Sequence, residues 1–273
     1  RYEDKCVARI VFQGKTYERE ILGSLGIISL GSIAIHLIML TLAYFAFLKM
    51  NLDKKQKGVF TFASTFANCG YMGIPVIAML FSGKEYLAEM LIYVSVYITV
   101  FNVLNWTVGI YIISGDKRFI SIKNAFLNPA TIATFIALPL FFAKINLSSI
   151  AIQLTDAFNL LGNMTTPVSM IIIGLKLAEM PFKEIFSSKH VYLTSFLKLI
   201  VMPLIMYLLL LPFKASISPV VIAVLLIISA MPTAANTVAN ADRFGGDSLS
   251  AAKAMLCSTI LCVLTLPVIT LLL

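Results

Sequence analysis

Long apolar stretches separated by short polar segments run along most of this chain. A membrane-spanning helix needs about 20 apolar residues at a rise of about 1.5 Å each. Measured against that length, the pattern predicts about eight spans, at roughly 22–48, 58–81, 87–113, 128–146, 150–177, 190–212, 216–241 and 248–273. Residues 1–20 are polar and form a separate N-terminal segment, so residues 21–273 are expected to form a single transmembrane domain.

The composition supports the same class of protein. Hydrophobic residues make up 59% of the chain, charged residues 12%, and the mean hydropathy is +0.94. Soluble domains carry about 25% charged residues, so an all-α polytopic membrane protein is predicted. The net charge of +8 does not indicate nucleic-acid binding, because no basic stripe with interleaved aromatic residues is present.

Basic residues are concentrated in alternate loops between the predicted spans. The rich loops hold Lys49, Lys54, Lys55, Lys57, Lys117, Arg118, Lys123, Lys176, Lys183 and Lys189. The other loops hold only Lys84, Lys144 and Lys214. Since lysine and arginine favour cytoplasmic loops, this pattern predicts a C-terminus outside the cell.

Two predicted spans contain helix-breaking residues. They read NCGYMGIP at residues 68–75 and MPTAANT at residues 231–237. Non-helical backbone survives at membrane depth only where protein or a water-filled cavity surrounds it. Two such breaks, one in each half of the chain, predict a carrier with a substrate site near the middle of the membrane.

A weak internal repeat relates the two halves. Phe81-Ser82-Gly83 follows the first break, Phe244-Gly245-Gly246 follows the second, and the two phenylalanines are 163 residues apart. The two broken spans are predicted to run in opposite directions, which is typical of an inverted repeat. If each helix of the second half has a counterpart 163 residues earlier, the counterparts of the spans that begin near 128 and 150 would start before residue 1. We therefore expect an inverted five-plus-five architecture with about eight of ten helices present, or alternatively an eight-helix protein.

The motifs at the breaks resemble those of the auxin efflux carrier family of transporters, particularly its bacterial members. They are FANCGYMGIPV at 66–76, MPTAANT at 231–237, ADRFGGD at 241–247 and GLKLA at 174–178. The resemblance implies an inverted five-plus-five fold with two broken crossing helices. It also implies transport of organic anions such as auxin, malonate and malate, in the plasma membrane or bacterial inner membrane, without a cofactor.

The substrate site is predicted at the two breaks. Asn68 and Asn236 have amide donors, and opened helix N-termini expose backbone N–H groups that attract anions. The alternative is that these asparagines only satisfy the broken backbone. Pro75 and Pro232 are expected to keep the helices broken, because proline lacks the N–H and disfavours a helical residue before it. Two glycines, Gly70 and Gly73, are expected to let the backbones cross closely.

Three ionisable residues inside spans are further candidates. Asp156 could carry a coupling proton or be a solvated acid near a span end. Lys198 is expected to snorkel to the cytoplasmic surface, or alternatively to attract an anion. A packing role is expected for His36, with a proton relay as the alternative.

Other functions make different demands on the sequence. An intramembrane enzyme needs paired acids or a nucleophile–base set, and only scattered single residues are present, so no enzyme and no metal site are predicted. A sodium-coupled organic-anion symporter and a channel stay open as alternatives. Expected partners are a small carboxylate, the lipid bilayer and, as an open alternative, a second copy of the chain in a homodimer.

Overall fold

The computed structural model is helical over most of the residues it describes, which are 3–127, 129–143, 152–178 and 181–271. The first half contains α1 (Glu3–Leu48), α2 (Lys54–Thr65), η1 (Cys69–Gly73), α3 (Ile74–Leu80), α4 (Leu87–Leu104), η2 (Asn105–Gly109), α5 (Ile110–Ser114), η3 (Lys117–Phe119), α6 (Ile122–Phe126) and α7 (Pro129–Phe142). The second half contains α9 (Ile152–Ala178), α10 (Phe182–Ile185), α11 (Lys189–Phe196), η4 (Leu197–Val201), α12 (Met202–Leu210), η5 (Leu211–Phe213), α13 (Pro219–Ser229), α14 (Asn236–Phe244) and α15 (Ser248–Thr270). In these ranges the β-structure is one isolated bridge.

Helices of membrane-spanning length confirm the predicted fold class. Four stretches are long and apolar enough to cross a bilayer, namely Glu20–Leu48, Leu87–Ser114, Lys189–Phe213 and Ser248–Thr270. The shorter apolar helices Cys69–Leu80 and Pro219–Ser229 are halves of the two broken spans. The described residues therefore form an all-α, polytopic membrane protein.

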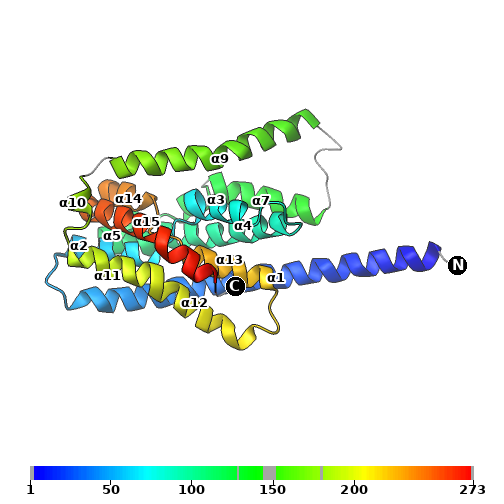
Figure 1. Cartoon of the computed structure of the whole chain (residues 1–273), viewed down its shortest axis with the longest axis horizontal. Helices are drawn as coiled ribbons and strands as arrows, with labels where there is room; N and C mark the ends of the chain where they lie inside the picture. Colours follow the sequence, from blue (N-terminus) through cyan, green and yellow to red (C-terminus); the bar gives the residue numbers. More distant parts are fainter. Residues whose placement is uncertain (1–2, 128, 144–151, 179–180, 272–273) are drawn as a thin grey trace.

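The first helix is longer than its predicted span. α1 has 46 residues and continues without a break through the polar N-terminal segment. At 1.5 Å per residue it is about 69 Å long, which exceeds the hydrocarbon thickness of about 30 Å. Its N-terminal part extends past the bundle (Figure 1), so it cannot all lie in the apolar core of one bilayer.

The centre of the bundle is formed by α13. Its residues 221–229 are all buried, as expected for a helix that is hydrophobic on every side. It packs against α1, α4 and α12. Stacked aromatic pairs extend this core, with ring centroids 5.5 Å apart for Phe47 and Phe60 and 4.3 Å apart for Phe62 and Phe66. The core thus surrounds the first break, which begins at Phe66.

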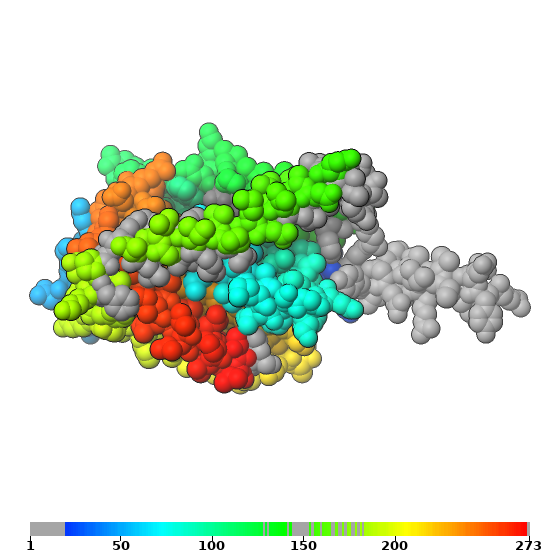
Figure 2. Space-filling view, turned by 45° about the horizontal axis from the view of Figure 1, so that its top comes forward, coloured from blue at the N-terminus to red at the C-terminus, as the bar shows by residue number. Residues whose placement is uncertain are grey.

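A separate helix, α9, lies along one face of the bundle (Figures 1 and 2). It contacts η1 and α3, the segment that follows the first break. Large apolar side chains on α9 are exposed, including Phe158, Leu160, Ile171 and Leu175. In a bilayer such side chains face lipid, so their exposure is consistent with a membrane helix.

The ADRFGGD motif forms the sharp turn between α14 and α15. Gly245 has φ +77°, which glycine adopts without strain, and ends α14. Asp247 then caps α15 by accepting a hydrogen bond from the N–H of Ser250 at 3.0 Å. After α3, Gly83 has a similar φ of +75°, so each of the two similar Phe-Gly motifs leads into a left-handed glycine. At the offset of 163 residues Gly83 corresponds to Gly246, so the two left-handed glycines differ by one position between the motifs.

Candidate transport site

The two broken spans meet at one point, where each supplies hydrogen-bond partners to the other. Ala67 and Thr233 form an antiparallel bridge. The N–H of Asn68 donates to the Pro232 carbonyl at 2.8 Å, and the N–H of Ala234 donates to the Phe66 carbonyl at 2.9 Å. We call residues 66–68 and 232–234 the crossing. The pairing is antiparallel, so the two extended segments run in opposite directions at the crossing.

Mutual pairing explains how the breaks are tolerated at membrane depth. An unpaired backbone group costs several kcal/mol in lipid, and the crossing satisfies groups that the opened helices release. The Thr233 hydroxyl donates a hydrogen bond to the carbonyl of Ala63 on α2 at 2.8 Å. The backbone N–H of Thr233 donates to the Ser258 hydroxyl of α15 at 3.1 Å. Sequence reasoning did not select Thr233 or Ser258, although a threonine directly after Pro232 was a signal.

The glycines and prolines near the first break have different roles. A Cβ on Gly73 would lie 2.5 Å from Cδ1 of Ile228 on α13, so the close contact at Gly73 is with a side chain rather than with the backbone of the crossing span. At Gly70 a Cβ would meet nothing within 4 Å, so this glycine does not permit a close contact among the described residues. Pro232 lies in the second break as predicted.

Pro75 differs from the prediction, because the first break at residues 66–68 lies well before it. Pro75 is instead near the N-terminus of α3 and directly follows the π-turn η1. Since proline has no N–H, the preceding turn loses a hydrogen bond and a wider turn is favoured. A second π-turn, η4, has the same relation to Pro203 at the start of α12.

The first break leaves hydrogen-bond donors available. Asn68 is 4% exposed, and its carbonyl accepts the N–H groups of Met72 and Gly73 at 3.3 and 2.9 Å. Among the described residues, the N–H groups of Gly70 and Tyr71 have no backbone acceptor. They lie at the N-terminus of the Cys69–Leu80 helix, where the helix dipole attracts negative charge.

The second break leaves an orphaned amide. Asn236 begins α14, and its Oδ1 atom is buried without a hydrogen-bond partner among the described residues. The structure therefore brings Asn68 and Pro232 into direct contact and places Asn236 four residues along from Pro232. Buried polar atoms are normally paired, so this unpaired amide oxygen fits a position that changes partners during function.

Lys198 is directed toward the second break, and the expectation that it snorkels to the surface is wrong. Its side chain is 0% exposed. Nζ donates to the Met202 sulfur at 2.7 Å and to the Ser229 carbonyl, at the end of α13, at 3.4 Å. Lys198 belongs to the π-turn η4, where the extra residue per turn changes the directions of the side chains. The depth of a residue along the span can be read from the sequence, but it does not determine the direction of the side chain.

No carboxylate neutralises this ammonium group in the described part of the chain. The ion pair found there joins Asp116 and Arg118. The partner of Lys198 is instead a carbonyl at a helix C-terminus, which carries partial negative charge. A buried ammonium group without a counter-charge is costly, so an anion beside Lys198 would stabilise its charged form.

The amino-acid sequence of the chain matches a known protein family over most of its length. The model of the membrane transport protein family matches residues 10–122 and 116–270, which is nearly the whole chain. The chain belongs to the auxin efflux carrier family. No curated protein matches it in sequence. Members of this family are membrane transporters, and we refer to the protein below as the transporter.

The acid predicted as a coupling candidate on α9, Asp156, lies at the surface of the transporter. Asp156 is exposed near the start of α9, which is the environment of a solvated acid.

Two pairs of buried polar side chains were not selected from the sequence. Asn240 Nδ2 donates to Asn105 Oδ1 at 3.0 Å, and Asn102 Nδ2 donates to the Thr131 hydroxyl at 3.2 Å. Both pairs join separate helices, so they hold the scaffold together around the broken spans.

A basic pocket adjoins the first broken span. It has a volume of about 450 Å³ and is lined by Lys54, Lys57 and Thr61 of α2 and by Tyr44 and Tyr111, among other residues. Lys57 also donates to the carbonyl of Leu48 at 2.8 Å, which caps the end of α1. The pocket therefore combines positive charge with access to the helix that leads to the crossing.

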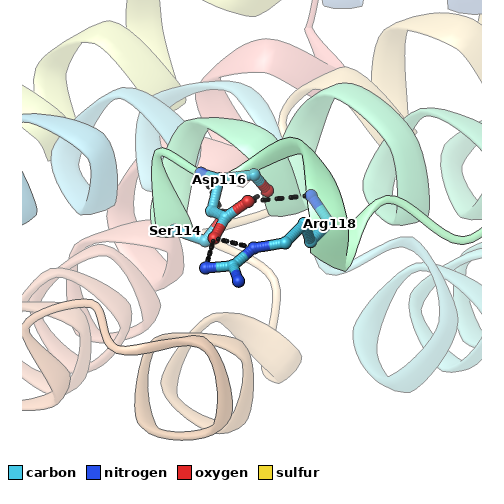
Figure 3. A network of polar contacts seen from close by, with 3 residues as sticks. All are labelled: Ser114, Asp116 and Arg118. Atoms are coloured by element: carbon cyan, nitrogen blue, oxygen red, sulfur yellow. Dashed lines mark hydrogen bonds and ion pairs between the residues drawn. The ribbon is translucent and has the colours of Figure 1, made fainter.

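The loop after α5 holds an exposed ion pair that is not part of this site (Figure 3). Arg118 NH2 and Asp116 Oδ2 are 2.6 Å apart, and the Arg118 side chain is 87% exposed. Hydrogen bonds from the Arg118 guanidinium and backbone N–H lower the pKa of Asp116. Solvent-exposed pairs of this kind contribute little to stability, so we assign it a local role in shaping the turn.

Proposed function

We propose that the transporter is a secondary carrier of small organic anions, of the malate, malonate or auxin type, and works by alternating access around the crossing. The observation that carries this proposal is the buried Lys198 ammonium beside the crossing, without a carboxylate partner in the described residues. A carboxylate that enters there would supply the missing counter-charge.

Neutral donors complete the proposed anion site. A desolvated carboxylate needs several hydrogen bonds as well as an opposite charge. The amide NH2 groups of Asn68 and Asn236 are suitable donors, and so are the N–H groups of Gly70 and Tyr71, which have no backbone acceptor among the described residues. Pro75, Pro232 and Gly73 position this backbone, whereas Gly70 has room for a ligand beside it.

Alternating access fits the way in which the crossing is held. Two backbone hydrogen bonds and the Thr233–Ala63 bond join the broken spans to each other. Few bonds would need to change when one broken span moves relative to the other. An inverted repeat would supply the two equivalent conformations, one open to each side.

A sodium-coupled symporter is the second candidate, and the position of Lys198 argues against it. In related architectures, coupling cations bind carbonyl groups at the C-terminal ends of broken half-helices. Here the Lys198 ammonium already interacts with such a carbonyl, that of Ser229. Malate uptake that persists when sodium is replaced by choline would agree with a built-in cation, and a strict sodium requirement would favour the symporter.

Uptake into proteoliposomes tests the proposed function. We expect saturable uptake of radiolabelled malate or malonate, with counterflow, whereas a channel would give currents that do not saturate. Lys198→Met should reduce uptake at least about tenfold, because a desolvated charge–charge interaction is lost. Lys214→Met, at an exposed loop position, is the matched control. Equal uptake by the two variants would contradict the proposed role of Lys198.

The proposed orientation places the transporter in the bacterial inner membrane with its C-terminus outside. A membrane-impermeable maleimide tests it on single cysteines at two exposed positions, Lys55→Cys and Ser82→Cys, in a Cys6→Ser background. The other cysteines, Cys69, Cys257 and Cys262, are buried. Labelling from outside is expected at position 82 but not at position 55, and the reverse result would invert the topology.

A further inference from the structure

Three polar side chains are buried together between α1 and α4, namely Ser32, His36 and Tyr97, and all three are 0% exposed. Ser32 and His36 are one helical turn apart on α1, and the rings of His36 and Tyr97 have centroids 5.6 Å apart. Among the described residues, the hydroxyls of Ser32 and Tyr97 have only each other as partners, and His36 Nε2 has no partner. Buried polar atoms are rarely left unpaired, so Nε2 beside these two hydroxyls indicates a site that is completed by a ligand.

The hydrogen bond on the other side of the imidazole determines what His36 can bind. Nδ1 is 2.7 Å from the Ser32 carbonyl. A carbonyl only accepts hydrogen bonds, so we assign the proton of the neutral ring to Nδ1. Nε2 then carries a free lone pair and faces no donor in the described residues. The smallest ligand that the lone pair of His36 Nε2 can bind is a proton.

This group of residues adjoins the crossing. The ring of His36 packs against Phe66, with centroids 5.3 Å apart, and against Phe101 at 6.3 Å. The carbonyl of Phe66 is the acceptor for Ala234 in the crossing. A change of charge on His36 therefore occurs one aromatic ring away from the backbone that pairs the two broken spans.

The ionisable groups around His36 come from three elements. Lys198 of η4 interacts electrostatically with His36 and with Cys69 of η1, and Cys69 interacts with Tyr97 of α4. α13 has no ionisable side chain, and those of α2 and α12 are Lys54, Lys55, Lys57 and Tyr207. The three lysines lie at the start of α2, near Leu48 at the end of α1, and therefore away from His36. Tyr207 lies beyond Lys198 in the sixth predicted span. Besides Tyr97, α4 carries Glu89 and Tyr93, two and one turns before Tyr97, and the Tyr93 hydroxyl donates to the Glu89 carboxylate. The positive charge that His36 meets is therefore that of Lys198.

We propose that Ser32, His36 and Tyr97 form a proton-binding site, in which His36 Nε2 takes up one proton from water when a carboxylate binds at the crossing. Two positive charges on His36 and Lys198 repel each other in a region of low dielectric constant, so without an anion only one of the two is charged. A bound carboxylate compensates the second charge. The transporter is then a proton–anion symporter, a conclusion that rests on the proposed function.

The chain contains only two histidines, so isotope labelling can follow His36 directly. In a protein labelled with ¹⁵N-histidine, the His190→Asn variant leaves His36 as the sole signal. Without substrate, the midpoint pH for protonation of Nε2 should be higher in Lys198→Met than in the parent by about one unit, a tenfold change in proton affinity. Identical midpoints in the two proteins would overturn the proposal.

Malate is the probe for the coupling. At a pH where Nε2 is unprotonated, saturating malate should convert His36 to the doubly protonated ring, and malate that is transported without this change refutes the coupling. If malate is neither bound nor transported, the carboxylate assignment of the proposed function fails, and the midpoint comparison still decides whether His36 and Lys198 compete for one proton.

Transport measurements give a second readout. His36→Asn keeps a donor for the Ser32 carbonyl but lacks Nε2. In this variant an inward proton gradient should no longer accelerate malate uptake, whereas His190→Asn should keep the acceleration. Acceleration of His36→Asn equal to that of the parent would exclude His36 as the coupling site.

Discussion

The approach of Gly73 to α13 gives a stability prediction with a matched control. In Gly73→Ala the new Cβ would lie 2.5 Å from Cδ1 of Ile228, with Met231 Cγ at 3.7 Å. Carbon atoms prefer separations of about 3.5–4.0 Å, so Ile228, which is 0% exposed, must move by about 1 Å or more. Overpacking of this kind costs about 1–3 kcal/mol.

Gly70→Ala controls for the change in backbone entropy. It lies in the same π-turn, and its Cβ would meet nothing within 4 Å. Both variants gain about 0.5–1 kcal/mol from replacing a helical glycine, so the difference between them isolates the clash. The expected difference is about 1–3 kcal/mol in the free energy of unfolding.

Thermal unfolding of the purified transporter measures this difference. Cys69, Cys257 and Cys262 are buried, so a thiol-reactive dye reports when the bundle opens. With a sensitivity of about 2–4 °C per kcal/mol, Gly73→Ala should melt at least about 2 °C below Gly70→Ala. Equal melting temperatures would refute the tight approach of α3 to α13 that the crossing requires.

Further predictions concern three polar side chains. Asn68→Ala should weaken malate binding while the protein still folds, because the amide donor at the crossing is lost; unchanged affinity in a titration would remove Asn68 from the site. Asp247→Ala should lower stability by about 0.5–2 kcal/mol through loss of the cap of α15. Burial raises the pKa of Asp247, but hydrogen bonds from Ser250 and Gln56 outweigh this effect and the pKa is lowered. The stabilisation is therefore present above the unfolded pKa of about 3.9 and is lost as the pH falls through the lower folded value, so melting curves of parent and variant should converge in acid. Asp156→Asn should leave the pH dependence of uptake unchanged, because this acid is exposed on α9; an altered pH profile would restore Asp156 as a coupling residue.

The fold was largely predictable because lipid solvation acts on local sequence. Each predicted span coincides with helices of the structure over the described residues. The second break lies within its predicted motif, whereas the first, at residues 66–68, shares only Asn68 with the predicted stretch 68–75. Helix breakers inside an apolar run have few structural solutions at membrane depth, so their positions are informative without any knowledge of packing. The unbroken course of α1 through residues 3–20 was not foreseen, because polarity does not prevent helix formation.

The site was predicted only in part, and the failures share one cause. Asn68, Pro232 and Gly73 lie at the crossing or against it, because their residue types are unusual in a membrane helix. Lys198 was assigned to the surface, and Thr233 was not selected. For both residues, the decisive fact is the partner on another helix, and hydrophobic pattern carries no information about that partner.

For this transporter, the sequence by itself determined which segments enter the membrane, where two of them break, and that acidic residues are scarce within them. Only the tertiary structure decided that the breaks pair with each other, that Lys198 is directed toward the end of α13, and that His36 adjoins Phe66. The physical reason is that the hydrophobic effect depends on composition along the chain. The direction of a side chain depends instead on helix rotation and on π-turns, which packing between distant segments determines.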